Sequence, residues 1–208
     1  QQMIVLMHAL VTEAALRPFP IYLDSPMAVE ATRIYAQYPD AHGVALNGVG
    51  GRSILYNKWV TTARSRQESE ALNTVKGPAV IISSSGMLTG GRILHHCRQR
   101  LPHAENTLLI TGYQAENTLG RALLDGAQSV RIHKAEVAVR AEVASLKGLS
   151  GHADAREMVR WLSAVDAPPR RVFLTHGEEL AALALGALIE KERGFKTHVP
   201  SPDESVEL

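Results

Sequence analysis

Short apolar runs alternate with helical stretches along the first 125 residues, and this alternation constrains the fold more than any other feature of the sequence. Strand candidates occupy residues 20–24, 78–83 and 107–111, and each is followed by a helical stretch, at residues 27–37, 90–100 and 118–124. Near-continuously apolar strands separated by helices are typical of a parallel sheet with helices on both faces. The sequence therefore predicts an α/β fold for this part of the chain.

The pattern changes after Gly126. Residues 129–133 and 136–145 alternate polar and apolar side chains with period two, which predicts antiparallel strands that partly face solvent. Further elements are expected in the order helix, strand, helix and strand, at residues 153–164, 171–175, 178–191 and 195–199. Residues 39–62 are rich in glycine and poorly periodic, so we expect a long loop or an irregular insertion there.

The start of the chain is apolar, but it lacks both the basic segment of a signal peptide and a helix-capping residue. We expect a helix at residues 1–10 whose beginning lies further upstream. No apolar run approaches the roughly 20 residues that span a bilayer, so no membrane partner is expected. With Cys97 as its single cysteine the chain forms no internal disulfide, and we predict a cytoplasmic protein. The net charge of +1 means that any polyanion must bind at a local basic cluster.

Four polar loops follow the strand candidates, at residues 24–28, 83–92, 112–121 and 176–178. In open α/β sheets, ligands bind beyond the carboxyl ends of the strands. The loop at residues 83–92 is the best phosphate candidate, because its glycines expose backbone N–H groups, its serines add donors and Arg92 adds charge. The same residues also suit a turn that only caps a helix, since the loop lacks the Gly-Lys-Ser/Thr ending of a P-loop.

Two histidines lie at element boundaries that suit metal binding or proton transfer, although a structural role is common at such positions. His152 opens a predicted helix, and His176 closes a predicted strand. The adjacent His95 and His96 face different sides of one helix, so we assign them to surface and packing, and Trp161 to packing. A zinc centre needs three or four ligands, and no segment supplies such a cluster. We expect this chain alone to bind no catalytic metal tightly.

Five motifs occur in an order that resembles the bacterial β-CASP ribonucleases of the metallo-β-lactamase family: IYLDSPMAVEATRIY, SSSGMLTGGRILHH, GYQAENTLGRALLDGA, LSGHAD and VFLTHGE. The resemblance runs from about residue 20 to the C-terminus. It implies that residues 1–130 form most of an N-terminally truncated β-CASP domain. Residues 131–208 would be the C-terminal return segment of a metallo-β-lactamase αββα domain, and RNA would enter the cleft between the two domains.

By this resemblance the chain is part of a zinc-dependent RNA exonuclease or endonuclease. His152, together with Asp154, is expected to stabilise the scissile phosphate or to protonate the leaving group. His176 is expected to ligate one of two zinc ions, and a histidine at this position resembles the RNA-cleaving branch rather than the DNA-repair branch. The loops that follow the strands are expected to hold the RNA backbone through Ser84, Ser85, Gly86, Arg92, Gly112, Tyr113, Gln114, Thr118 and Arg121.

The chain departs from the family pattern at two places. The His-x-His-x-Asp-His metal signature is absent, so we expect two zinc ions in the full-length protein and none in this part, which would be inactive alone. Asn117 replaces a more usual glycine, although asparagine tolerates left-handed backbone well. A non-catalytic paralogue that binds RNA or acts as a scaffold is the alternative, and the retained His152 and His176 argue against it. The apolar helical face at residues 180–189 fits either a core or a homodimer contact.

Overall fold

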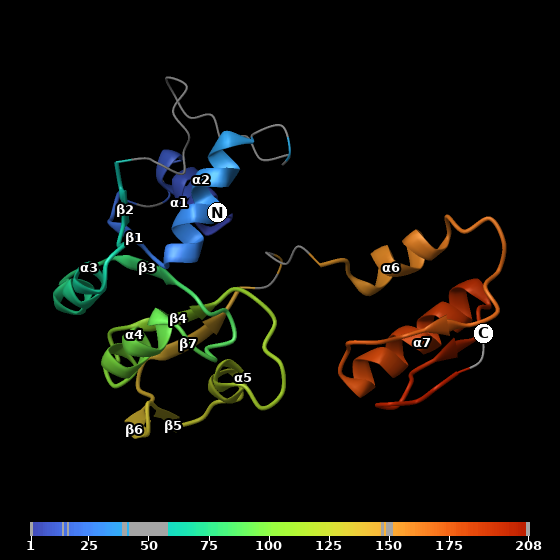
Figure 1. Ribbon diagram of the computed structural model, residues 1–208. Coiled ribbons are helices and arrows are strands. Elements are labelled where there is room, and N and C mark those ends of the chain that lie inside the picture. Colours follow the sequence, from blue (N-terminus) through green and yellow to red (C-terminus); the bar gives the residue numbers. More distant parts are fainter. Residues whose placement is uncertain are drawn as a thin grey trace. The chain divides into compact units, whose positions relative to one another are not determined.

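The computed structural model describes residues 2–13, 15, 17–38, 41, 58–146, 148 and 152–206. They form two compact units, Gln1–Leu149 and Ser150–Leu208, which Figure 1 shows in blue to yellow and in orange to red. Within both units the hydrogen-bonded strand pairs are parallel apart from one hairpin. The predicted α/β class is confirmed. None of the described helices is long and apolar enough to cross a membrane.

The first sheet of unit 1 has the strand order β2-β1-β3. The central strand β1 (Ile21–Asp24) pairs in parallel with β2 (Val60–Thr62) and with β3 (Val80–Ser83). Two strands were therefore predicted correctly, whereas β2 lies in the stretch that we expected to be a loop. Residues 39, 40 and 42–57 of that stretch lie outside the described part of the chain.

Side chains of Ser25, Ser65 and Thr118 cap three of the helices described in unit 1. Helix α1 (Gln2–Thr12) confirms the helix expected at the start of the chain. Three others follow strands, and each confirms a prediction: α2 (Pro26–Gln37), α4 (Arg92–Arg100) and α5 (Leu119–Leu124). The short α3 (Arg66–Ala71), which continues into the 3-10 turn η3 (Leu72–Thr74), was not predicted. Its six residues are almost entirely polar, so they give no apolar periodicity, and a capping box of Ser65 and Glu68 starts the helix.

The second sheet pairs β4 (Thr107–Ile110) with β7 (Glu142–Ser145) in parallel. The antiparallel prediction holds only for the hairpin of β5 (Ser129–Ile132) and β6 (Ala135–Ala138), and it is wrong for β7. The chain changes direction between β6 and β7, where the backbone N–H groups of Arg140 and Ala141 both donate to the carbonyl of Leu101. These bonds interrupt the period-two run and lead β7 along β4. A cavity of about 510 Å³, lined by residues of both strands, lies between β3 and β4.

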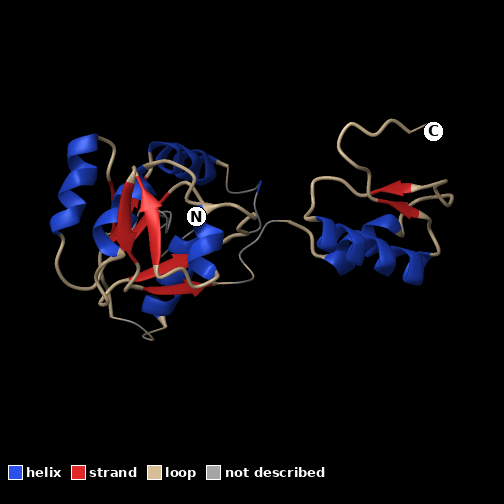
Figure 2. Ribbon diagram, turned by 90° about the horizontal axis from the view of Figure 1, so that it is seen from below, coloured by secondary structure: helices blue, strands red, loops and turns tan. Residues whose placement is uncertain are grey.

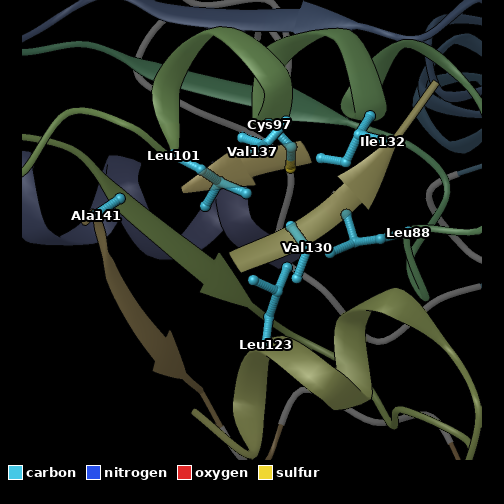
Figure 3. Packing of buried hydrophobic residues seen from close by; sticks show 8 residues of the cluster. All are labelled: Leu88, Cys97, Leu101, Leu123, Val130, Ile132, Val137 and Ala141. Atoms are coloured by element: carbon cyan, nitrogen blue, oxygen red, sulfur yellow. The ribbon is translucent and has the colours of Figure 1, made fainter. Parts of the chain in front are cut away.

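A contiguous apolar core joins α4, α5, the β5–β6 hairpin and the loop after β3. In Figure 3 the side chains of Cys97 and Leu101 lie against those of the hairpin strands. The buried members of this core are Leu88, Cys97, Leu101, Leu123, Val130, Ile132, Val137 and Ala141. Burying one Leu or Val side chain contributes about 1.5–3 kcal/mol. Leu88, which is 4% exposed, thereby anchors the loop at residues 83–92 to the core.

The described residues of unit 2 form four elements, all of them predicted: α6 (Ala155–Leu162), β8 (Val172–Phe173), α7 (Glu179–Arg193) and β9 (Thr197–His198). The two strands are parallel, and both helices lie on the same side of them (Figure 2). Val159, Ile189 and Phe195 form the core of the unit.

Several apolar side chains of unit 2 face outward instead of packing, Trp161 and Leu180 most of all. Trp161 is 75% exposed, so the packing role expected for it is wrong within this unit. The apolar face of α7 is partly buried and partly exposed to solvent. Leu185 and Leu188 pack on the core, whereas Leu180 is 83% exposed. The exposed part of α7 is the part available for the predicted homodimer contact.

Candidate functional site

The carboxylate of Asp24 is the centre of a buried polar cluster at the end of β1. Asp24 is fully buried, and three side chains contact its two oxygens. Oδ2 accepts a hydrogen bond from Ser69 Oγ of α3 at 2.6 Å and lies 2.6 Å from His96 Nε2 of α4. Oδ1 accepts from Arg92 Nη1 at 2.7 Å. One carboxylate therefore joins the end of β1 to α3 and to the first turns of α4.

Electrostatics favour the ionised form of this carboxylate. Burial by itself would raise the pKa of Asp24, but the hydrogen bonds from Ser69, His96 and Arg92 outweigh it and lower the pKa below its usual value. An ionised carboxylate can only accept hydrogen bonds, so Nε2 of His96 is the donor in the contact with Asp24. His96 is 4% exposed, and no residue in the described part of the chain pairs with its Nδ1 atom.

Arg92, one of the expected RNA contacts, uses most of its guanidinium for internal bonds. Besides Asp24, Nη1 donates to the carbonyl of Ala63 at 2.9 Å, and Nη2 donates to the carbonyl of Arg64 at 2.9 Å. Its side chain is 21% exposed. Arg92 thus fastens the start of α4 to the segment after β2, and any contact with RNA would use the remaining N–H groups.

The loop between β3 and α4 lies against the start of α2. Ser84 Oγ is 2.7 Å from Ser25 Oγ, and Ser25 also caps α2 by accepting from the backbone N–H of Ala28. Gly91, which precedes α4, has φ +78, and a β-carbon there would lie 2.5 Å from the carbonyl oxygen of Ser84. Two helices of nine or more residues thus begin beside one serine-rich loop, and helix N-termini attract anions.

The hydroxyls of this loop are not equally available. Ser84 is bonded to Ser25, and Ser85 Oγ lies 3.0 Å from the hydroxyl of the exposed Thr89. Gly86 is exposed, and its carbonyl accepts from Gln114 at 2.9 Å. The structure therefore joins Gly86, which lies in the same loop as Ser84 and Ser85, to the second predicted RNA-binding loop.

That second loop, between β4 and α5, has one buried and several exposed members. Gln114 is 4% exposed, whereas Tyr113 is 59% exposed and Gly112 is also exposed. Thr118 caps α5, since its hydroxyl accepts from the backbone N–H of Arg121. The Nε group of Arg121 donates to the carboxylate of Asp125 at 3.0 Å. Asn117 has φ +62, which is the left-handed conformation that asparagine was expected to tolerate.

The expected catalytic residues lie in unit 2. His152 is exposed just before α6, and Asp154 is the N-cap of α6. Asp154 Oδ1 accepts from the backbone N–H of Glu157 at 2.8 Å, so this carboxylate has a clear structural role. His176 is exposed after β8 and has φ +65, just before Gly177 and the N-cap Glu178 of α7.

Metal-ligating side chains are scattered in the described part of the chain. Among the described residues, His, Cys, Asp and Glu side chains nowhere form a group of three or more that could hold an ion. The described part of the chain therefore does not fit a zinc centre by itself. His176 is accessible as one ligand, and the remaining ligands of any such centre would come from elsewhere.

Sequence reasoning placed Asp24 and Gly120 in candidate loops without individual roles, gave Ser69 none, and assigned His96 with His95 to packing and surface. A charged residue that ends a buried strand is a signal for a buried polar cluster, and Asp24 carries that signal. The partners Ser69 and His96 are 45 and 72 residues away from it in sequence, so no local pattern connects them. Gly120 lies inside a motif, but its contact with Gln114 depends on how the two loops pack.

Comparison with protein families gives a direct result for the first unit. The model of the Beta-Casp domain matches residues 1–123, more than half of the chain. This chain belongs to the metallo-β-lactamase/β-CASP family. The model of the Zn-dependent metallo-hydrolase RNA specificity domain matches residues 136–200. These matches and the two compact units divide the chain at different positions, so the boundary near residue 130 stays a prediction.

Several curated proteins resemble this β-CASP chain over most of its length. A ribonuclease from Thermus thermophilus is 39% identical over 172 residues, which cover 82% of the chain and 39% of the ribonuclease. A transcription termination factor from Pyrococcus horikoshii is 33% identical over 91% of the chain and 30% of the factor. An RNase J-like protein from Methanocaldococcus jannaschii is 29% identical over 96% of the chain and 45% of that protein. The chain thus spans less than half the length of each of these relatives.

Proposed function

We propose that this protein is a zinc-dependent RNA nuclease that hydrolyses phosphodiester bonds in RNA processing or decay. The observation that carries the proposal is the order of two domains in one chain, a β-CASP domain followed by a metallo-hydrolase RNA specificity domain. The relatives that share this region include proteins named ribonuclease and RNase J-like protein. Because the chain spans 39% of the ribonuclease, the activity of the whole protein belongs to the proposal.

In this proposal the two polar loops of unit 1 hold the RNA backbone. The loop after β3 offers the hydroxyls of Ser85 and Thr89 beside the starts of α2 and α4. The loop after β4 offers the exposed ring of Tyr113, on which a base can stack. Hydroxyl and backbone N–H donors recognise phosphate oxygens, which occur at every nucleotide. Such a surface binds RNA without reading its sequence.

The histidines of unit 2 would serve the chemistry. We assign His176 as one zinc ligand, with the other ligands supplied from outside the described residues. A zinc pair would supply an activated hydroxide and would stabilise charge on the phosphate. His152 would contact the scissile phosphate or give a proton to the leaving oxygen, and Asp154 would hold the start of α6 that presents His152.

Zinc content and RNA cleavage by the longest natural form of the protein test this proposal. We expect about two zinc ions per chain and cleavage of unstructured RNA. His176→Ala should lower the zinc content and abolish cleavage. The matched control is His103→Ala, because the side chain of His103 is 59% exposed and belongs to a different unit. Full activity of the His176→Ala variant would contradict the ligand assignment.

The non-catalytic alternative also draws on an observation, since several relatives are named transcription termination factors rather than ribonucleases. A folded protein that holds no zinc and binds RNA without cleaving it would favour an RNA-binding or scaffold role. A homodimer formed through the exposed Leu180 and Leu183 of α7 stays a separate proposal. The mass of the protein in solution tests it, with Leu180→Ser as the variant expected to dissociate a dimer.

A further inference from the structure

Gln114 connects the two polar loops of unit 1 through one amide group. Its Nε2 atom lies 2.9 Å from the carbonyl oxygen of Gly86, in the loop after β3. The same atom lies 3.1 Å and 2.8 Å from the carbonyl oxygens of Gly112 and Tyr113, in its own loop. An amide group has two N–H donors, and here three carbonyl oxygens surround them. The side chain is 4% exposed, so these bonds are shielded from water.

Gly120 leaves the space that this side chain fills. A β-carbon at Gly120 would overlap Oε1 and Cδ of Gln114, and it would lie 3.3 Å from the carbonyl oxygen of Met87. The backbone N–H of Gly120 donates to that same carbonyl at 3.3 Å. The two loops therefore meet at two contacts. Gln114 of the second loop contacts Gly86 of the first, and Gly120 of α5 contacts Met87 of the first.

Both connections lie beside the groups expected to contact RNA. The carbonyl of Tyr113 is fixed by Gln114, and the residue is 59% exposed. On the other side, Gly86 directly follows Ser85 in the chain. The amide of Gln114 thus sets the position of Tyr113 relative to the hydroxyl groups of the first loop.

We propose that Gln114 is a positioning residue that locks the loop after β4 to the loop after β3, with Gly120 providing the space for its side chain. The lock fixes one continuous surface for the RNA backbone, and this inference rests on the RNA-binding function proposed above. Gln114 itself contacts no RNA in this scheme, because its side chain is buried. Its role differs from the direct RNA contact expected from the sequence.

Steady-state cleavage of RNA by the longest natural form of the protein tests the lock. Gln114→Ala removes the amide, and Gln114→Met keeps a similar side-chain volume but removes the N–H donors. Both variants should raise KM roughly tenfold, which corresponds to the net contribution of one or two hydrogen bonds, and should leave kcat within about twofold. Partial unfolding would instead reduce the amount of active protein and so lower the apparent kcat with KM unchanged.

Gln128→Ala is the matched control, because the exposed Gln128 donates only to the carbonyl of Gly126, next to it on the surface. It should cleave RNA with the KM of the unmodified protein. A KM unchanged in both Gln114 variants would overturn the proposal, as would an equal increase in the Gln128→Ala variant.

A double-mutant cycle tests the geometry without RNA. Gly120→Ala should destabilise the unmodified protein and the Gln114→Met variant, because a β-carbon meets the Gln or Met side chain in both. The same substitution should be much less costly in the Gln114→Ala background, where only the Met87 carbonyl remains nearby. Urea denaturation measures the three costs, and equal costs in all three backgrounds would overturn the assignment of Gly120.

The two measurements separate this inference from the proposed function. If the unmodified protein neither binds nor cleaves RNA, the proposed function fails and the role in RNA positioning fails with it. If the unmodified protein cleaves RNA and the Gln114 variants do so with unchanged KM, only the lock is overturned.

Discussion

Asp24 and His96 lie 72 residues apart in sequence, and their Oδ2 and Nε2 atoms are 2.6 Å apart in a buried contact. The contact joins the end of the central strand β1 to helix α4. Ser69 and Arg92 bond the same carboxylate, so three segments of the chain depend on one side chain. The predicted RNA-binding loop after β3 is built on this framework, since it leads directly into α4.

Asp24→Asn should therefore destabilise unit 1 strongly. The substitution leaves the size of the side chain unchanged but removes the charge that Arg92 and His96 contact, and it replaces one acceptor with a donor. Removing one partner of a buried ion pair costs about 3–5 kcal/mol, and the partial exposure of Arg92 places the expected loss near the lower limit. Urea denaturation followed by circular dichroism measures it.

The matched control is Asp125→Asn, because Asp125 also pairs with an arginine, Arg121, but on the surface, where its side chain is 61% exposed. Exposed ion pairs contribute little to stability, so this variant should unfold close to the unmodified protein. Equal losses in the two variants would show that the Asp24 cluster is no more important than a surface pair.

The contribution of Asp24 should depend on pH in a defined direction. Because the folded state lowers the pKa of Asp24 below its usual value of 3.8, the folded protein binds this proton less tightly than the unfolded chain does. The stabilisation is complete above the unfolded pKa and is lost as the pH falls through the folded pKa. The difference in unfolding free energy between the unmodified protein and Asp24→Asn should thus shrink as the pH falls below about 4. A difference that grows towards acid pH would contradict this assignment.

Apolar periodicity was sufficient to predict most of the secondary structure, and it failed where tertiary contacts decide. The strands β1, β3 and β4 are short apolar runs, and this pattern predicts them although only β1 is mostly buried. The strand β7 follows a period-two run, but its partner is set by the bonds of Arg140 and Ala141 to Leu101, which no local pattern reveals. The strand β2, with only three residues, carries too little pattern to separate it from a loop.

For the site, the sequence identified the loops but not the way they are held together. Serines and glycines after buried strands indicated the phosphate-type loops, and these loops do lie at strand ends. The sequence could not show that Arg92 bonds inward to Asp24 or that Gln114 is buried, because both depend on the distance between loops that are far apart along the chain. Amino-acid type alone made both residues suitable for contacts with RNA.

Gly91→Ala should destabilise the protein, whereas Gly90→Ala should not. Gly91 has φ +78, and an added β-carbon would lie 2.5 Å from the carbonyl oxygen of Ser84. Left-handed strain and this close contact together should cost about 2 kcal/mol or more. A β-carbon at the neighbouring Gly90 meets no atom within 4 Å, so Gly90→Ala is the matched control. Thermal unfolding measures both variants, and equal melting temperatures would contradict the close approach of Gly91 to Ser84.

Cys97 should be unreactive in the folded protein. Burial raises the pKa of its thiol to about 11, and the residue is 4% exposed in the core beneath α4. Only the thiolate attacks alkylating reagents, and at pH 8 a thiol with this pKa is ionised to about one part in a thousand. Iodoacetamide at pH 8 should therefore leave Cys97 unmodified over a period in which the urea-unfolded chain reacts completely, as measured by mass spectrometry. Cys97 packs against the β5–β6 hairpin in the folded protein. Asp24→Asn destabilises the unit, so it should raise the population of molecules in which this packing is open and thereby accelerate the reaction. Rapid labelling of the unmodified folded protein would show instead that this core is open to solvent. The core would then not hold the loop after β3 in place.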